Sequence, residues 1–252
     1  MHALVIIPAR LGSSRLPGKP LADIHGKPMI VHVAERARAA AIGEVLIAAA
    51  EAEIAAAVRE AGFPAVLTDP ALPSGSDRVA AALAAFDPAG RFETVINLQG
   101  DLPTIAPEAI RAVLAPLAEP GFDIGTLVAP LSHEEAALPS VVKAACAFAP
   151  GREIAPALYF SRAVIPGGEG PLWHHIGLYA YRRSALLRFV SLPPSPLETR
   201  EQLEQLRALE AGLRIGVCRI PEGPFGVDTE ADLARARAVL APTAAPLRGE
   251  CR

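Results

Sequence analysis

Short apolar runs rich in β-branched residues alternate with longer stretches of Ala, Leu, Arg and Glu through the first half of the chain. The short runs are typical of buried strands, and the longer stretches repeat their apolar residues at helical spacing. The predicted strands are Ala3–Ile7, Val45–Ala48, Ala65–Thr68 and Thr94–Leu98. The predicted helices are Pro28–Ala40, Glu51–Ala61, Ser76–Phe86 and Pro107–Leu117. This strict alternation predicts an α/β fold whose sheet is mostly parallel and carries helices on both faces.

The second half of the chain is less regular. Its predicted strands are Asp123–Val128, Val141–Phe148, Leu158–Pro166, His175–Tyr181 and Arg214–Ile220. Its predicted helices are Leu197–Ala211, which is strongly amphipathic, and Glu230–Leu240. Pro166–Pro171 is rich in Gly and Pro and is interpreted as a mobile loop, and Ala241–Arg252 as a frayed tail. In the first half, Gly62 is expected to stop one helix and Ser76 to cap the next.

Composition narrows the class of protein. The 252 residues fit one large α/β domain, and 51% hydrophobic against 20% charged residues excludes intrinsic disorder. With 24 basic and 27 acidic residues, the chain lacks the basic excess of a protein that binds nucleic acid through bulk charge. No signal peptide and no apolar run of about 18 residues is found, so no membrane segment is expected. The cysteines stand far apart, which favours a reducing, cytoplasmic setting over a disulfide framework or zinc site.

The candidate chemistry begins directly after the first strand, in a loop within Pro8–Leu21 that is rich in Gly, Ser and Pro. Its fixed cations are Arg10, Arg15 and Lys19. Glycines let backbone N–H groups approach an anion, and the cations add charge-assisted hydrogen bonds, so the loop indicates a polyphosphate site. It is not a Walker A loop, because five residues separate Gly12 from Gly18 and Pro20 replaces the Ser or Thr that would hold magnesium. A solvated basic turn is the alternative.

Two acidic residues follow glycine-containing turns in places where strands or extended segments end. Asp101 comes after the fourth predicted strand, and Asp228 lies in Phe225–Glu230 ahead of the last helix. Either could simply serve a turn or cap a helix. Taken together, two carboxylates that hold Mg²⁺ against a basic phosphate loop would make a nucleotidyl-transfer site.

These motifs together resemble the nucleotide-sugar pyrophosphorylase superfamily and, more closely, the 3-deoxy-manno-octulosonate cytidylyltransferase (CMP-Kdo synthetase) family. The opening motif is shared with other sugar-acid cytidylyltransferases, whereas the segments around Phe160, Glu198 and Gln205 are more specific to the Kdo enzymes. The matching segments are Ile6–Leu21, Asp23–Val33, Ser74–Arg78, Asn97–Asp101, Ala157–Pro166, His175–Tyr179, Pro194–Glu198, Leu203–Arg207 and Gly226–Thr229. They occur in the family's order over nearly the whole chain.

The resemblance implies a role for each matching residue. The CTP phosphates and nucleotide would be held by Arg10, Gly12, Ser13, Ser14, Arg15, Lys19, Ser74, Gly75, Ser76 and Arg78. Asp101 and Asp228 would bind Mg²⁺ and, with Lys19 and Arg10, carry catalysis. The Kdo pocket would be lined by Gln99, Arg162, His175, Tyr179, Glu204 and Gln205. A sugar acid needs a cation and mixed hydrogen-bonding groups, which suits this set.

The resemblance also implies a Rossmann-like nucleotidyltransferase fold with a mixed, mostly parallel central sheet and a small dimerisation lobe. Residues 1–245 would form one domain, followed by a tail at 246–252. Within the domain, 1–120 would bind CTP and about 121–220 would bind the sugar and form the dimer. Residues 221–245 would supply the metal-binding Asp and the last helix. The implied reaction is CTP + Kdo → CMP-Kdo + pyrophosphate, catalysed by a homodimer. Alternatives are a cytidylyltransferase for another sugar acid, such as an 8-amino Kdo analogue or a nonulosonate, and a non-catalytic CTP-binding relative.

The chain departs from the family pattern at several positions. The family's second strand usually ends in Ala-Thr-Asp, where this chain has Ala48–Ala50, and the usual Gly-Asp-Glu-Pro carries Leu102 in place of Glu. His174 stands where the family has Arg before the site histidine, and the Pro166–Pro171 loop is shorter than in many relatives. The change at Ala50 removes any nucleotide or metal contact that the Asp makes, and the change at Leu102 removes a negative charge beside the predicted metal position.

Overall fold

The structure is a computed structural model that describes residues 3–12 and 15–241. The strands are β1 (Ala3–Ala9), β2 (Asp23–Ile24), β3 (Lys27–Pro28), β4 (Gly43–Ala49), β5 (Ala65–Leu67), β6 (Thr94–Asn97), β7 (Ile124–Leu131), β8 (Lys143–Cys146), β9 (Ile154–Ser161), β10 (Leu172–Arg182) and β11 (Ile215–Arg219). The helices are η1 (Lys19–Leu21), α1 (Met29–Ala39), α2 (Ala52–Glu60), α3 (Gly75–Phe86), α4 (Pro107–Ala112), α5 (Ala115–Ala118), α6 (His133–Ala136), α7 (Arg183–Ser191), α8 (Pro196–Glu201), α9 (Gln205–Glu210) and α10 (Glu230–Val239).

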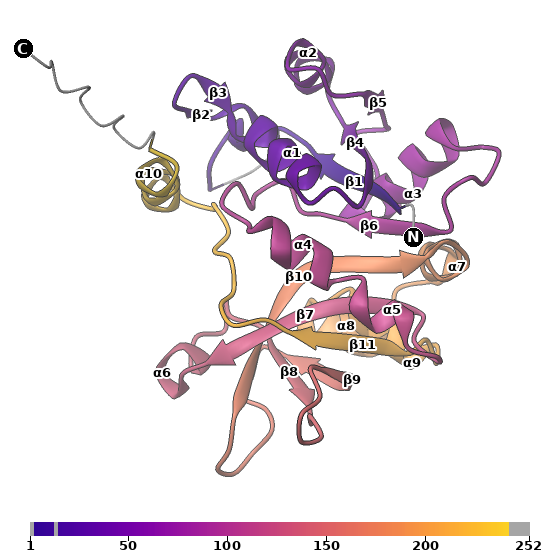
Figure 1. The fold of residues 1–252 in the computed structure, drawn as a ribbon, viewed down its shortest axis with the longest axis vertical. Helices are drawn as coiled ribbons and strands as arrows, with labels where there is room; N and C mark the ends of the chain where they lie inside the picture. Colours follow the sequence, from indigo (N-terminus) through magenta and orange to yellow (C-terminus); the bar gives the residue numbers. More distant parts are fainter. Residues whose placement is uncertain (1–2, 13–14, 242–252) are drawn as a thin grey trace, which may run out of the picture.

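One large mixed sheet organises the molecule, in the order β5-β4-β1-β6-β10-β7-β11-β9-β8 (Figure 1). Strands β5, β4, β1 and β6 are parallel, as the strand–helix alternation predicts, and β2 and β3 form a separate antiparallel pair. β10 enters antiparallel between β6 and β7, and β9 and β8 are antiparallel to their neighbours. The predicted α/β fold with a mixed, mostly parallel central sheet is therefore confirmed.

β10 joins the two halves of the sheet. Its last residues, Tyr179–Arg182, pair with β6, whereas the strand as a whole pairs with β7. Near its start, His174 also pairs with Lys143 of β8, so β10, β7, β11, β9 and β8 form a closed ring of neighbours. The register between β10 and β7 shifts between Ile176 and Tyr179. Side chains of β10 can thus reach from this ring toward the edge of the parallel sheet.

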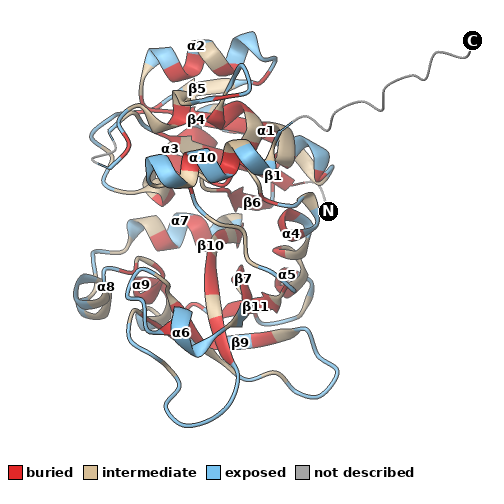
Figure 2. Ribbon diagram, turned by 90° about the vertical axis from the view of Figure 1, so that its left-hand side faces the viewer, coloured by how far each residue is buried: buried red, intermediate tan, exposed pale blue. Residues whose placement is uncertain are grey.

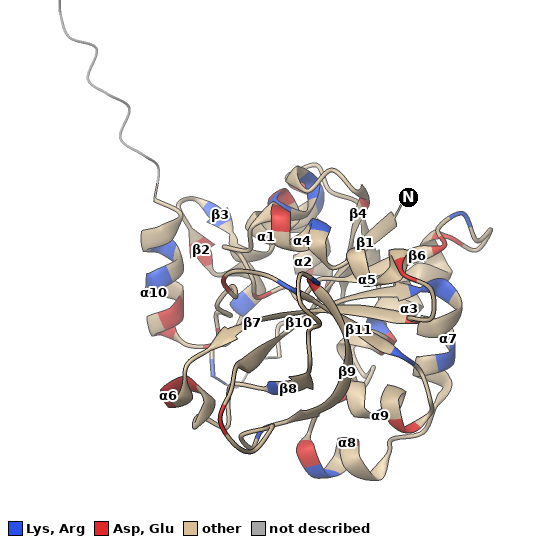
Figure 3. Ribbon diagram, turned by 60° about the horizontal axis from the view of Figure 1, so that its bottom comes forward, with Lys and Arg blue, Asp and Glu red and all other residues tan. Residues whose placement is uncertain are grey.

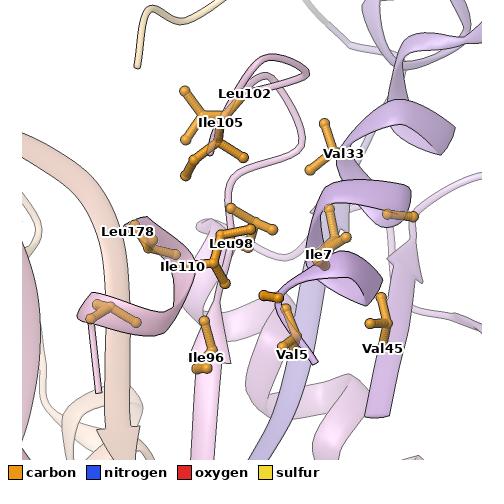
Figure 4. Close-up of a cluster of buried hydrophobic side chains, with 14 of the residues drawn as sticks. Val5, Ile7, Val33, Val45, Ile96, Leu98, Leu102, Ile105, Ile110 and Leu178 are labelled. Atoms are coloured by element: carbon orange, nitrogen blue, oxygen red, sulfur yellow. The ribbon is translucent and has the colours of Figure 1, made fainter. Parts of the chain in front are cut away.

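The hydrophobic core lies on both faces of the parallel strands. Val5 and Ile7 of β1 face one cluster, with Ile96 of β6, and Leu4 and Ile6 face the other. All of them are fully buried, which is why these strands appear as continuous apolar runs in the sequence. The central strands are accordingly almost entirely buried in Figure 2, and Figure 4 shows part of the first cluster. A sheet covered on both faces leaves its strand ends as the place for polar chemistry.

Several predicted elements were wrong in detail. Ser74, not Ser76, is the N-cap of α3, since its side chain accepts a hydrogen bond from Asp77 N. The helix predicted over Pro107–Leu117 is two helices, α4 and α5, because Pro116 begins a new first turn. The Leu197–Ala211 helix breaks into α8 and α9 at Gln202, which is left-handed at φ 55°.

Other differences concern whole elements. β9 covers Ile154–Ser161, earlier than the predicted Leu158–Pro166, and α7 was not predicted. Pro166–Pro171 contains no helix or strand, as expected of a loop. The tail predicted from Ala241 lies, from residue 242 onward, outside the described residues. In the described part of the chain, no helix is both long and apolar enough to cross a membrane.

Candidate functional site

A cavity of about 380 Å³ opens where β1 and β6 end. This volume is typical of a small-molecule site. The predicted nucleotide contacts that line it are Arg10, Gly12, Arg15, Lys19, Ser74, Gly75 and Arg78, and Gln99 and Asp101 line it too. Three segments that lie far apart in the sequence therefore meet around one space. Ser13 and Ser14, the other predicted contacts of the loop, lie outside the described residues.

Lys19 connects the two predicted metal-binding carboxylates. Its Nζ donates to Asp101 Oδ2 at 2.9 Å and to Asp228 Oδ1 at 3.1 Å, while Arg15 Nη2 lies 3.1 Å from Asp228 Oδ2. Burial alone would lower the pKa of Lys19, but the carboxylates of Asp101 and Asp228 outweigh it, so the pKa of Lys19 is raised. The structure thus brings together two acids and two cations that the sequence places in three separate segments.

Backbone contacts hold Asp228 at this position. Val227 N donates to Asp101 O at 2.9 Å, and Asp228 N donates to Asp232 Oδ2 at 3.1 Å. Thr229, not Asp228, caps α10 through a capping box with Asp232, so the carboxylate of Asp228 is available to the site. Leu233 of α10 packs in a small cluster with residues of the β2–β3 region. α10 lies on the same side of the molecule as β2 and β3 (Figure 1). Its first turn is acidic and its last turn basic, visible as red and blue bands in Figure 3, which suits the helix dipole.

The two carboxylates suit a magnesium ion better than a metal with a full set of protein ligands. Within residues 3–12 and 15–241, no group of three or more His, Cys, Asp or Glu side chains could hold a metal. Mg²⁺ is usually bound by one or two carboxylates, with substrate phosphates and water completing its shell. Asp101 and Asp228 beside a basic cavity match that donor set.

Arg78 lines the cavity but is tied to the segment that precedes α3. It is 3% exposed, and its Nη1 donates to Thr68 Oγ1 at 2.6 Å and to Asp69 O at 3.0 Å. Burial and the charge of Arg10 lower the pKa of Arg78. The guanidinium therefore holds the Thr68–Pro70 segment, which leads into the Leu72–Ser74 wall of the cavity that Arg78 also lines.

Glu204 lies at the centre of a polar network between the cavity and the second half of the chain. Hydrogen bonds join its Oε1 to Ser74 Oγ (2.7 Å) and its Oε2 to Ser76 Oγ (3.1 Å). Burial raises the pKa of Glu204, against the lowering effect of these two hydroxyls. Asn97 extends the network, since its Nδ2 lies 3.5 Å from Ser76 Oγ and its Oδ1 accepts from Gln99 Nε2 at 3.1 Å. Sequence analysis missed Asn97 as a site residue, although it is the last residue of β6.

The other predicted sugar contacts differ in their burial, their hydrogen-bond partners and their position relative to the cavity. Gln205 is buried, and in the described part of the chain its Nε2 has no hydrogen-bond partner. His175 is buried with Nε2 3.1 Å from Thr126 Oγ1, and its ring centre lies 5.5 Å from that of Tyr179. Arg162 is engaged elsewhere, because its guanidinium donates to the carbonyls of Glu201, Gln202 and Pro139. Of the six, Gln99 is the one found among the described residues that line the cavity.

Burial lowers the pKa of His175 to about 3, with a smaller effect from His174. Its imidazole is therefore neutral at neutral pH and serves as a hydrogen-bonding and packing group rather than as a cation. Its ring also packs edge-on against Phe160, with ring centres 4.6 Å apart.

Glu51 is a second residue that sequence analysis missed. Its Oε2 accepts a hydrogen bond of 3.0 Å from Leu11 N, which ties the start of the basic loop to the N-cap of α2. The neighbouring Ala50 stands where the family usually has Asp, and its N–H donates to Ala9 O at 2.9 Å. Glu51 directly follows Ala50, the position where the family usually has Asp, and this neighbouring carboxylate could have indicated the contact.

Leu102 does not take the place of a site ligand. It is 7% exposed and packs in the core cluster with Ile105 and Ile110, where Figure 4 shows it. Its backbone is directly bonded to that of Asp101, yet its side chain is buried among apolar residues. The departure from the usual Glu therefore changes the core, and the carboxylates of Asp101 and Asp228 keep their contacts with Lys19.

Comparisons with known proteins show which family the chain resembles in sequence and structure. A family model described as cytidylyltransferase matches residues 4–215. The chain is 63% identical over 242 residues to a Rhodospirillum centenum protein named 3-deoxy-manno-octulosonate cytidylyltransferase, covering 96% of this chain and 94% of the relative. A Paramagnetospirillum magneticum protein of the same name is 58% identical over 238 residues, covering 94% and 97%. A solved structure of CMP:2-keto-3-deoxy-manno-octonic acid synthetase complexed with CTP superposes with a TM-score of 0.88 at 40% identity, covering 96% and 99%.

Proposed function

This chain belongs to the cytidylyltransferase family, and from that premise we propose that its basic cavity binds CTP and that the network beyond Glu204 binds the sugar acid. The relatives confirm the family resemblance found in the sequence. The protein is an enzyme, a nucleotidyltransferase that transfers CMP from CTP to 3-deoxy-manno-octulosonate, giving CMP-Kdo and pyrophosphate. This reaction activates Kdo for lipopolysaccharide synthesis.

The observation that carries the assignment of the site is the contact of one ammonium group with two carboxylates beside the basic cavity. Phosphoryl and nucleotidyl transfer need positioning and charge neutralisation more than covalent chemistry. Arg10, Arg15 and Lys19 would donate charge-assisted hydrogen bonds to the triphosphate and stabilise the leaving pyrophosphate. Ser74, Gly75 and Arg78 would hold the nucleotide against the start of α3.

Asp101 and Asp228 would hold Mg²⁺, for which their donor set fits. When bound, Mg²⁺ supplies neutralisation of phosphate charge and lowers the pKa of the attacking hydroxyl. The chain's own part is to keep both carboxylates close together, and the contact between Val227 N and Asp101 O supports that arrangement.

The sugar acid would lie between the cavity and β10. Gln205 supports this placement best, because its buried Nε2, which has no hydrogen-bond partner among the described residues, offers two hydrogens to ligand oxygens. Gln99, Glu204 and Tyr179 would add donors and acceptors for the sugar hydroxyls, and neutral His175 would pack against Tyr179. Arg162 fits a carboxylate contact less well, because three backbone carbonyls already accept from its guanidinium.

The setting of the reaction is also part of the proposal. We place the enzyme in the cytoplasm, where the free thiols of Cys146 and Cys218 would stay reduced. We propose a homodimer, since the second half exposes the large apolar residues Leu138, Leu158 and Val164, the second of them 67% exposed.

The test is pyrophosphate release from purified protein with Mg²⁺ and CTP, with and without Kdo. Release that depends on Kdo supports the proposed substrate and shows that Ala50 and Leu102 are compatible with turnover. Release with another sugar acid, such as an 8-amino Kdo analogue, but not with Kdo would identify that acid as the substrate instead. CTP binding by calorimetry without release from any acid would overturn the catalytic assignment.

A further inference from the structure

We propose that Lys19 occupies the metal position in the free protein, so that divalent-cation binding is weak until the nucleotide phosphates draw the ammonium group away. This inference rests on the proposed function, because it takes the cavity to be the triphosphate site. It gives Lys19 a second task besides its contact with phosphate: it couples metal binding to nucleotide binding.

The contacts of Lys19 explain why it competes with a metal. Its Nζ lies within 3.1 Å of one oxygen of Asp101 and one of Asp228, and its side chain is only 16% exposed. Arg15 neutralises the other oxygen of Asp228. Two carboxylates are therefore already matched by two fixed cations. A divalent cation that approaches the same oxygens must displace the ammonium group, because like charges repel strongly at such short range.

The local structure lets Lys19 leave without refolding. The turn before it is set by Gly18 in the left-handed region (φ 68°), and Lys19 N donates to Leu16 O at 3.2 Å. Pro20, the next residue, is buried. The backbone is thus anchored, whereas the ammonium group sits on a flexible four-carbon stem. Lys19 and Asp101 line the same cavity, so a small swing of this side chain would reach a bound phosphate.

The energetic consequence is reciprocal coupling. In the free protein, the carboxylates favour the ammonium group that is already present. Once Lys19 donates to a phosphate, Asp101 and Asp228 lose a counter-charge and their affinity for a divalent cation rises. By thermodynamic linkage, if bound nucleotide increases the affinity for metal by some factor, bound metal increases the affinity for nucleotide by the same factor. An enzyme built this way would hold little metal in the absence of CTP.

The test measures metal binding to the free protein, without nucleotide or sugar. Mn²⁺ is the probe, followed by electron paramagnetic resonance and calorimetry, for the wild type and for Lys19→Met and Lys19→Gln. Removing the ammonium group should tighten Mn²⁺ binding by at least about fivefold, the lower end of typical coupling between sites. Two substitutions are used so that a folding defect in one, seen by thermal unfolding, leaves the other to decide.

Matched controls identify the site and the cause. Lys27→Met removes an equally charged lysine that pairs with Glu35 at 2.7 Å on the surface, and it should leave Mn²⁺ affinity unchanged. Arg15→Met, which removes a cation contacting Asp228 but not Asp101, should tighten binding less than the Lys19 variants. Adding Asp101→Asn to Lys19→Met should abolish the gain. A gain that survives Asp101→Asn, or that Lys27→Met reproduces, would overturn the proposal.

The outcome is separable from the proposed function. If the wild type forms CMP-Kdo but neither Lys19 variant binds Mn²⁺ more tightly than the wild type, the competing role of Lys19 is wrong and the proposed activity stands. If the Lys19 variants bind Mn²⁺ more tightly but the wild type forms no CMP-Kdo, the competing role stands as a property of the metal site and the proposed substrate is wrong.

Discussion

The ion pair between Glu198 and Arg207 should be one of the strongest single contributors to stability in the second half of the chain. Arg207 Nη2 donates to Glu198 Oε1 at 2.6 Å and its Nε donates to Oε2 at 2.8 Å, a two-pronged contact. The side chains are only 10% and 14% exposed. The pair ties α8 to α9 across the left-handed residue Gln202, where an unbroken helix was predicted.

Removing one partner of such a pair leaves the other charged and buried, which costs about 3–5 kcal/mol. Because both groups keep slight solvent contact, we expect Arg207→Ala to lower the free energy of unfolding by about 3 kcal/mol, toward the lower end of that range. Burial would raise the pKa of Glu198, but the hydrogen bonds from Arg207 and Ser195 N outweigh it and lower the pKa below 4.5. The pair's contribution is therefore present above pH 4.5 and is lost as the pH falls through the lowered native value.

The assay is urea unfolding of the wild type, Arg207→Ala, Glu198→Ala and the double variant at neutral pH, repeated at acid pH. The double-variant cycle should show a coupling energy of about 1–3 kcal/mol that shrinks in acid. Lys27→Ala, which breaks the exposed pair with Glu35, is the control and should cost less than about 1 kcal/mol. Additive effects in the cycle, or an Arg207→Ala variant as stable as the control, would refute this reasoning.

Four further predictions concern the site. Lys19→Ala should lower turnover by about 10²-fold or more with little change in the unfolding midpoint, because its partners Asp101 and Asp228 are 31% and 41% exposed; equal turnover would contradict the phosphate role. Asp101→Asn should weaken the Mg²⁺ dependence of the rate, and activity that persists in EDTA would show that the metal assignment is wrong. Glu51→Gln should raise the KM for CTP more than it lowers kcat, since it loosens the contact with Leu11 N. The NMR signals of the His175 ring should stay unchanged as the pH is lowered through 6.5, because its native pKa is about 3.

The parallel half of the fold could be predicted from the sequence because each of its main strands and helices has a recognisable local residue pattern. β1 and β4 are short, largely buried apolar runs that contain Val and Ile, and this length and content favour a buried strand over a helix. The basic loop follows β1 directly, so its place at the strand end was predictable as well. Asp101 follows β6 in the same way, and the cavity confirms that these strand ends meet.

Other features depend on contacts that no local pattern shows. The apolar spacing of Leu203, Leu206 and Leu209 continues through Gln202 as if the helix were whole, and the break is stabilised by the ion pair that joins its two pieces. Ser74 and Ser76 are equally good caps by residue type. The choice falls on Ser74 because its hydroxyl lies where it can accept from Asp77 N and also bond to Glu204, 130 positions away.

The contact between Val227 and Asp101 has a consequence for how the site forms. Lys19 is 82 positions from Asp101 and 209 from Asp228, so the cluster needs both ends of the chain. The parallel pairing of β1 with β6 brings Lys19, which follows β1, close to Asp101, which follows β6. Asp228 arrives only when the segment after β11 crosses back, bonds its backbone to Asp101 and packs α10 on the β2–β3 region. Without this segment Asp101 would keep its ammonium partner but lack the second carboxylate of the proposed metal site. The proposed metal position therefore depends on the segment after β11, and any change that loosens α10 should weaken metal binding before it disturbs the nucleotide cavity.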